Sequence, residues 1–280
     1  MSLKNQSLKV SVIIPTVEYD QNLKNLLIDL GKQTFVFEEI IVVAKSASVN
    51  VDDGFLGERK VKVFVKSEMN KSAACNFGSQ MAVGEVLVFL DDDCVPAAEN
   101  WLSTLVEPFI SDMQAEAVSG RITVPGSSLT NSFVRQMNGL GTPDYGDVDF
   151  AFKDQFKAFP ATNLAVKKSV YQSLGGFDSE MHVAEDVDFY IKLHEKNMTA
   201  NYASKAVMHH LHADSLAGLL RHSWKTGVGS CGFIRKHGFW NKYLPGTSLS
   251  VFCIPLFLLS AVLVFLAVAG VVNPLLLLVY

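Results

Sequence analysis

Three consecutive aspartates, Asp91-Asp92-Asp93, follow directly on the apolar run 86–90. A short apolar run of this kind predicts a buried strand. The carboxylates therefore fall where the strand leaves the core, which is the edge at which open α/β sheets bind ligands. Asp91 and Asp93 are suited to share a divalent cation and its nucleotide, because Mg²⁺ and Mn²⁺ favour carboxylate, water and phosphate oxygens. A solvated acidic turn is the alternative that the triplet alone leaves open.

The composition indicates one α/β domain with an appendage. The chain has 280 residues, of which 49% are hydrophobic, and a formal net charge of -4. This mild acidity argues against a nucleic-acid partner, which favours a basic face. The cysteines are scattered, without metal-ligand spacing or a disulfide framework, and they fit a reducing compartment; they are Cys75, Cys94, Cys231 and Cys253.

Strands and helices are expected to alternate in the first half of the chain. The expected strands are 10–14, 39–43, 61–65 and 86–90, and the expected helices are 22–30 and 72–82, the second capped by Ser72. This alternation predicts right-handed βαβ units and a mainly parallel sheet. Later elements are a helix at 101–110, a strand at 117–124, helices at 169–174 and 185–197, and a strand at 201–208. Residues 126–146 predict a loop.

The C-terminal part has the pattern of a membrane segment. Residues 249–272 contain no charged residue, which is enough chain to cross a hydrocarbon core of about 30 Å. After Asn273-Pro274, residues 275–280 have the pattern of the start of a second span. Basic and aromatic residues precede the run and predict a segment in the headgroup region; they are Arg221, Trp224, Lys225, Phe233, Arg235, Lys236, Phe239, Trp240, Lys242 and Tyr243. The positive-inside rule then places the N-terminal domain in the cytoplasm.

Several short motifs follow one another in order. They are Pro15-Thr16 after the first strand, Lys71 to Gly78, the aspartate triplet, Thr162-Asn163, Gly175-Gly176-Phe177-Asp178 and Glu185-Asp186-Val187-Asp188. In this order and spacing, residues 10–212 resemble the family 2 glycosyltransferases with the GT-A fold. The resemblance implies a Rossmann-like α/β sheet with flanking helices, a UDP- or GDP-linked sugar donor, and Mn²⁺ or Mg²⁺. The expected parts are the GT-A domain 1–212, the interfacial helical segment 213–247 and the transmembrane region 248–280.

The resemblance also implies roles for individual residues. The donor is expected at Pro15, Thr16, Glu18, Lys71, Asn76, Asp91 and Asp92, and the metal at Asp91, Asp93, His210 and His212. The acceptor is expected at Asn163, Gly176, Phe177 and Asp178. Asp186 is the expected general base, with Glu185 beside it, because a positioned carboxylate accelerates attack by a hydroxyl about 10²–10⁴-fold. On their own, these two acids also fit the first turn of a helix, where they favour the helix dipole.

The sequence departs from the family pattern at two donor positions. Ala44-Lys45-Ser46 replaces the acidic turn that normally reads the base, and Cys75 stands where an arginine is usual. Diphosphate contact is therefore expected from Lys71. The expected function is a membrane-anchored, metal-dependent, inverting transfer to a hydroxyl of a lipid-linked or polymeric glycan. The alternatives are a polyprenyl-phosphate acceptor, which is anionic and needs no base, and a non-catalytic nucleotide- or glycan-binding module.

Overall fold

The computed structural model describes residues 8–47, 60–111, 115–123, 145–152, 156–211 and 216–238. Its strands are β1 (Val10–Thr16), β2 (Glu39–Ala44), β3 (Lys60–Val65), β4 (Val86–Phe89), β5 (Cys94–Pro96), β6 (Ala117–Thr123), β7 (Phe150–Phe152), β8 (Leu164–Lys167) and β9 (Ala200–His210). Its helices are α1 (Gln21–Gly31), α2 (Lys71–Met81), α3 (Trp101–Ile110), the 3-10 helix η1 (Ala161–Asn163), α5 (Lys168–Ser173), α6 (Glu185–Glu195) and α7 (Leu216–His237). The strands and helices expected in the first half are confirmed to within a residue or two.

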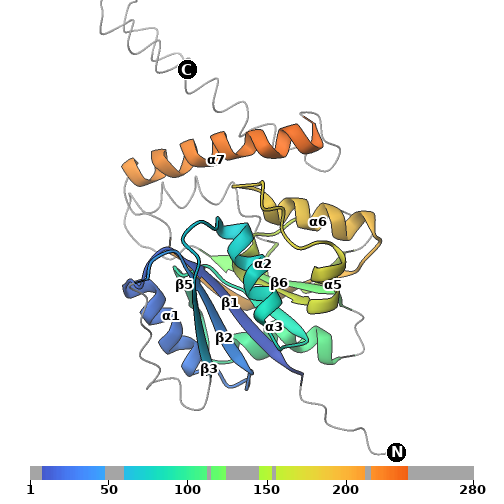
Figure 1. Cartoon of the computed structure of the whole chain (residues 1–280). Coiled ribbons are helices and arrows are strands. Elements are labelled where there is room, and N and C mark those ends of the chain that lie inside the picture. The colour runs from blue at the N-terminus through green and yellow to red at the C-terminus, as the bar shows by residue number, and fades with distance from the viewer. Residues whose placement is uncertain are drawn as a thin grey trace, which may run out of the picture.

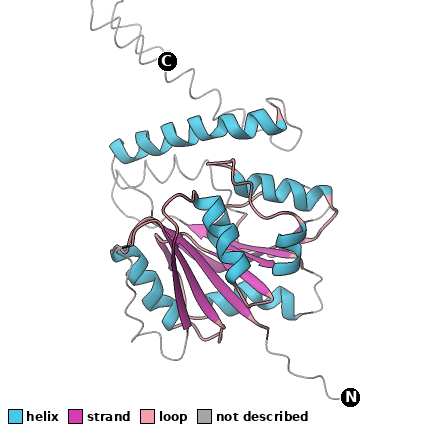
Figure 2. Cartoon of the chain, in the orientation of Figure 1, coloured by secondary structure: helices cyan, strands magenta, loops and turns pink. Residues whose placement is uncertain are grey.

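The sheet is buried on both faces, as its apolar strands predict. In β1, Val12 and Ile14 face the core that α1 and α3 cover, whereas Ile13 faces the core shared with α2, α5 and α6. This alternation follows from the two-residue period of a strand. Figure 2 shows the strands as one twisted layer with helices on both sides. The arrangement holds the ends of the strands at a fixed edge of the domain.

The strand order adds antiparallel pairings to the mainly parallel sheet that was expected. The order is β3-β2-β1-β4-β8-β6-β9-β5, with β7 paired to β9. The pairings β1–β2, β2–β3, β1–β4 and β6–β9 are parallel, whereas β4–β8, β6–β8, β5–β9 and β7–β9 are antiparallel. The sheet is therefore mixed. Alternating strands and helices predict parallel units, but they do not reveal that β8 inserts between β4 and β6.

The N-cap of helix α2 lies two residues before the expected Ser72 cap. Asn70 is the N-cap, and its side chain accepts a hydrogen bond from the backbone N–H of Ala73 at 2.9 Å. Ser72 is buried and donates instead to the carbonyl of Met181 at 3.2 Å. Either side chain is a competent cap by type. The long-range contact to Met181 decides between them, and it leaves Lys71 as the first residue of the helix.

Helix α7 is fastened to the domain at two places. Its Phe233 is buried against Met181 and Ile191. Nearer the middle of the helix, a Cβ atom added at Gly229 would lie 2.4 Å from Cγ2 of Val183, so only glycine permits this approach. In Figure 1, α7 lies across the top of the domain, beyond α2 and α6.

Ion pairs also hold the C-terminal end of α7 against the domain. Lys236 lies 2.6 Å from Asp178 and 2.8 Å from Asp188, while His237 lies 2.7 Å from the same oxygen of Asp188. Asp188 is fully buried and also pairs with Lys192 at 2.9 Å. Burial makes such a carboxylate costly unless cations surround it, so these contacts fix the position of the helix.

None of the described helices has the length and apolarity that crossing a bilayer requires. The apolar run 249–272, the expected second span and most of the expected loop 126–146 lie outside the described residues. The expected interfacial segment overlaps α7, which is helical as predicted.

Asn163 joins two strands of the sheet to a helix that packs on it. Its Oδ1 accepts a hydrogen bond from the indole N–H of Trp101 at 3.1 Å, and its Nδ2 donates to the carbonyls of Arg121 at 3.0 Å and Ala206 at 2.9 Å. The residue is fully buried. Its amide is therefore occupied in tying α3, β6 and β9 together at η1.

We expect Asn163→Ala to lower the free energy of unfolding by roughly 3–5 kcal/mol, because it leaves buried polar groups without partners. Chemical denaturation monitored by circular dichroism measures the change. Asn25→Ala, at an exposed position of α1, is the matched control and is expected to have little effect. An Asn163→Ala protein as stable as the control would contradict the structural role.

Candidate active site

The ammonium group of Lys71 lies between acidic side chains at the C-terminal edge of the sheet. Its Nζ is 2.6 and 2.9 Å from the two carboxylate oxygens of Asp91, and 3.9 Å from Oε1 of Glu185. Thr162 adds a hydrogen bond to Asp91, with 2.8 Å between Oγ1 and Oδ2. The strand end after β4, the first turn of α2, η1 and the start of α6 therefore meet at one point.

This arrangement gives Asp91 and Lys71 opposite charges that reinforce each other. Burial alone would raise the pKa of Asp91, but Lys71 and His210 overcome it and lower the pKa to about 2. Burial likewise opposes the charge on Lys71, whereas Asp91 and Glu185 raise its pKa above the ordinary value. Both groups are charged at neutral pH, and they form a fixed ion pair at the edge of the sheet.

The Glu185-Asp186 pair opens α6. Ala184 precedes it in a left-handed backbone conformation, with φ of 64°, and provides no side-chain cap. One oxygen of Asp186 accepts the backbone N–H of Val187 at 2.7 Å, and the other accepts that of Ala161 at 3.2 Å. The carboxylate is thus held between the helix start and η1, with both of its oxygens oriented by backbone donors.

The environment of Asp186 favours a proton acceptor near neutral pH. Burial raises the pKa of Asp186 to about 7, and the charge of Glu185 adds to the effect. Lys71 and the two backbone donors act in the opposite direction. A carboxyl group with a pKa close to neutrality is well matched to general-base catalysis.

Asp93, Cys94 and His210 form a candidate cation site. Their ligand atoms all lie within 4.8 Å of one another, and Nε2 of His210 is 3.0 Å from Oδ1 of Asp93. The strands bring them together, because Cys94 of β5 is the register partner of His210 in β9. Burial raises the pKa of the Cys94 thiol, which leaves the carboxylate and the imidazole as the principal ligands.

This donor set fits a divalent cation that also binds phosphate. Mn²⁺ accepts imidazole together with carboxylate oxygens, and a site with few protein ligands leaves positions for water and substrate oxygens. A cation held here by Asp93 and His210 would supply positive charge to a bound phosphate group. Of the residues expected at the metal, Asp91 lies 3.7 Å from Nε2 of His210 but pairs with Lys71, and His212 lies outside the described residues.

Asp92 points to the turn after β1. Its Oδ2 lies 2.5 Å from Oγ1 of Thr16, and the Thr16 hydroxyl also lies 2.9 Å from the carbonyl oxygen of Glu18. Burial raises the pKa of Asp92 to about 6, with added repulsion from Asp93 and Asp91. Pro15 is half-buried beside this turn and the Glu18 side chain is exposed. Each aspartate of the triplet therefore has a different partner. Asp91 contacts Lys71, Asp92 contacts Thr16, and Asp93 contacts His210.

Four other expected site residues are placed in supporting positions. Asn76 exchanges hydrogen bonds with the backbone of Phe177, at 2.8 and 3.0 Å. Phe177 is buried among aromatic rings, and Gly176, with φ of 68°, leaves room for Asn76. Asp178 pairs with Lys236 of α7. These side chains, like Asn163, are engaged in holding the site's framework in place.

Two partners of the site are not among the residues that the sequence predicted for it. Thr162 binds Asp91, and the backbone N–H of Ala161 binds Asp186. Both lie in η1, immediately before β8. Because β8 runs antiparallel to β4 and pairs Leu164 with Phe89, its start lies beside the end of β4. Knowledge of that pairing would have pointed to Thr162.

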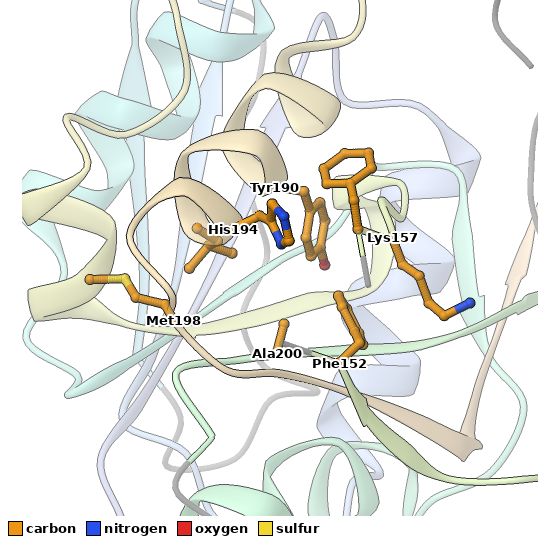
Figure 3. A pocket seen from close by; sticks show the side chains of 8 residues that line it. Phe152, Lys157, Tyr190, His194, Met198 and Ala200 are labelled. Atoms are coloured by element: carbon orange, nitrogen blue, oxygen red, sulfur yellow. The ribbon is translucent and has the colours of Figure 1, made fainter. Parts of the chain in front are cut away.

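A small hollow lies beside α6, the helix that contains Asp186, and is separate from the carboxylates. It has about 200 Å³ of empty space, and its lining is Phe152, Phe156, Lys157, Tyr190, Leu193, His194, Met198 and Ala200. Figure 3 shows Tyr190 and His194 side by side in it, with Phe152 and Ala200 across from them. The hollow contains none of the expected catalytic residues.

Comparison with known proteins identifies the family. Residues 11–175 match the model of glycosyl transferase family 2. This match covers more than half of the chain, which therefore belongs to glycosyl transferase family 2 and is an enzyme of the transferase class. The match includes β1, the aspartate triplet and η1, whereas Glu185-Asp186 and α7 lie beyond it.

Individual relatives are distant. The chain is 23% identical over 222 residues to the O-antigen biosynthesis protein RfbC of Myxococcus xanthus, covering 72% of this chain and 17% of RfbC. It is 26% identical over 214 residues to the pre-mycofactocin glycosyltransferase of Mycobacterium tuberculosis, covering 74% of this chain and 43% of that protein. The chain thus spans less than half the length of either relative.

Solved structures share the fold. A mannosyltransferase of Pyrobaculum calidifontis, PcManGT in complex with GDP-Man and Mn²⁺, has a TM-score of 0.58 at 21% identity and covers 81% of this chain and 63% of its own. S. aureus TarS 1-349 in complex with UDP-GlcNAc has a TM-score of 0.57 at 18% identity, covering 81% of this chain and 67% of its own. These similarities establish a GT-A-like fold for the described domain.

We expect Glu185→Gln to lower the pKa of Asp186 by about one pH unit, because it removes a neighbouring like charge. Protein labelled with ¹³C at aspartate carboxyl carbons reports this pKa by NMR, and the signal is assigned by its loss in Asp186→Asn. Glu107→Gln, on the exposed face of α3, is the control. An Asp186 signal that titrates near pH 4 in the unmodified protein would contradict the account.

Lys71→Met is expected to move the same titration in the opposite direction, raising the pKa of Asp186 by about one pH unit, since the nearby positive charge is lost. It is also expected to lower kcat/KM about tenfold or more through the unpaired Asp91. Lys71→Arg keeps the charge and is expected to leave the Asp186 titration close to its original position. Equal titrations in the Met and Arg variants would exclude an electrostatic role for Lys71.

Proposed function

We propose that this protein transfers a sugar, with inversion, from a nucleotide-sugar to a hydroxyl group of a lipid-linked or polymeric glycan. The observation that carries the proposal is that Lys71 and η1 join Asp91 to the Glu185-Asp186 pair, with the pKa of Asp91 lowered and that of Asp186 raised. Two carboxyl groups whose environments separate their pKa values in this way are suited to different tasks.

In the proposed reaction, the acceptor hydroxyl attacks the anomeric carbon as its proton passes to Asp186. A bond forms between the acceptor oxygen and that carbon, while the bond from the carbon to the diphosphate oxygen breaks. The nucleoside diphosphate leaves with the bonding electrons. Lys71, on the first turn of α2, would stabilise its charge, and so would a cation if Asp93 and His210 held one.

The donor is assigned to the edge between β1 and β4. Asp92 and Thr16 offer a carboxylate and a hydroxyl, 2.5 Å apart, to a ribose. PcManGT binds GDP-Man with Mn²⁺, and TarS binds UDP-GlcNAc. These two ligands support a nucleotide-sugar donor for the shared fold and a Mn²⁺ or Mg²⁺ cofactor, and they leave both UDP and GDP sugars as candidates.

The pKa of Asp186 favours a hydroxyl acceptor over a polyprenyl phosphate. A phosphate is already anionic and needs no base, whereas a sugar hydroxyl requires a group that takes its proton. The names of relatives refer to O-antigen biosynthesis and to pre-mycofactocin, which is compatible with a glycan or glycolipid acceptor. Membrane attachment with the catalytic domain in the cytoplasm completes the proposal, and the basic residues of α7 and the uncharged run 249–272 support it.

The test is release of nucleoside diphosphate by the full chain in membranes, screened over UDP and GDP sugars with Mn²⁺, Mg²⁺ or EDTA. We expect metal-dependent release with one donor, and a loss of about 10²–10⁴-fold in kcat for Asp186→Asn. The rate should rise with pH through about 7, since Asp186 accepts a proton only when it is ionised.

The matched control is Asp29→Asn, which removes a carboxylate in the last turn of α1, outside the aspartate triplet. It should retain full activity. Donor binding without release for every sugar would instead favour a non-catalytic binding module. Full activity of Asp186→Asn on a phosphate acceptor would replace the hydroxyl assignment by the polyprenyl-phosphate one.

A further inference from the structure

The two faces of α7 have different surroundings. The inner face packs against the domain through buried Phe233 and through the contact of Gly229 with Val183. Lys236 and His237 form ion pairs with Asp188. These contacts come from the loop before α6 and from α6 itself. The helix is therefore held in one orientation, and its opposite face is presented outward in a fixed direction.

The outer face carries cations interleaved with large apolar groups. Arg221, Trp224, Lys225, Val228 and Arg235 follow one another at intervals of three, one, three and seven residues, which places them on one stripe of a helix. All five are exposed, Trp224 by 59% and Val228 by 58%. No acidic residue occurs anywhere in Leu216–His237. We call these five residues the outer stripe.

We propose that the outer stripe lies on an anionic phospholipid surface. Arginine and lysine at this spacing attract lipid phosphates, while an exposed tryptophan and valine between them gain by entering the interface between headgroups and acyl chains. An acidic polymer would engage the cations but would leave the indole and the valine in water. The uncharged run 249–272 follows α7 in the sequence, which brings the helix within reach of any bilayer that the run enters.

The orientation of α7 then sets the position of the active site. Gly229 touches Val183, three residues before Asp186 in the chain. Seating the outer stripe on lipid therefore places the start of α6 just beneath the headgroups. This inference rests on the proposed membrane attachment and deepens it, because it names the face of α7 and the lipid chemistry involved; it does not depend on the donor, the acceptor or the base.

Cys231 offers a reporter on this helix. It is exposed, whereas Cys75 and Cys94 are buried and protected from labelling. Full chain carrying Cys253→Ser is labelled at Cys231 with an environment-sensitive fluorophore and placed in nanodiscs of phosphatidylcholine alone or mixed with phosphatidylglycerol. We expect a blue-shifted emission that brominated lipid quenches in the mixed discs, and loss of both effects in the triple variant Arg221→Glu, Lys225→Glu and Arg235→Glu.

Lys9→Glu, Lys60→Glu and Lys196→Glu, at exposed positions away from α7, change the net charge equally and should preserve the quenching. A probe that stays in a water-like environment in both kinds of disc overturns the proposal. A probe shielded from water but not quenched by brominated lipid also overturns it, because protein would then cover the face. Equal quenching in the triple variant and the control overturns recognition of anionic lipid. Diphosphate release measured on the same discs reports separately on the transfer reaction.

Discussion

The ammonium group of Lys71 is the interaction on which the acidic edge of the sheet depends. It contacts both oxygens of Asp91 and approaches Glu185 within 3.9 Å. Without this cation, Asp91, Glu185 and Asp186 would share a poorly solvated space as like charges, and protonation would relieve the repulsion indiscriminately. With it, the protonation states of the carboxyl groups differ: Asp91 stays ionised, and the pKa of Asp186 is raised. A single side chain thus gives neighbouring carboxyl groups different chemical characters.

The antiparallel strands of a mixed sheet bring the remaining groups to this edge. Strand β8 starts where β4 ends, so η1 presents Thr162 to Asp91 and a backbone N–H to Asp186. Strand β9 ends where β5 begins, so His210 meets the residues after Asp92. In a purely parallel sheet, starts and ends of strands occupy opposite edges. Because β8 runs antiparallel to β4 and β5 runs antiparallel to β9, the start of one strand and the end of its partner meet at the same site.

The sequence was informative where chemistry and periodicity are local. Apolar runs located the strands of the first half, and the residue types of Asp91, Asp93 and Asp186 indicated carboxylate chemistry. It was less informative where contacts are long-range. Asn163 and Phe177 belong to motifs that suggest ligand contact, yet their side chains are buried in hydrogen bonds and aromatic packing. Ser72 and Asn70 are both good caps, and the carbonyl of Met181 decides between them. Such outcomes require the pairing of distant segments, which periodicity does not encode.

The close approach of α7 to the loop before α6 restricts how this enzyme can diverge. Any residue larger than glycine at position 229 would overlap Val183, so the helix or the loop would have to move. That loop leads directly into the carboxylates that open α6. A chimera in which a helix from another protein replaces α7 would need a glycine at the position equivalent to 229, whatever the rest of its sequence. Position 229 of this helix is therefore nearly closed to substitution unless the helix or the loop moves with it.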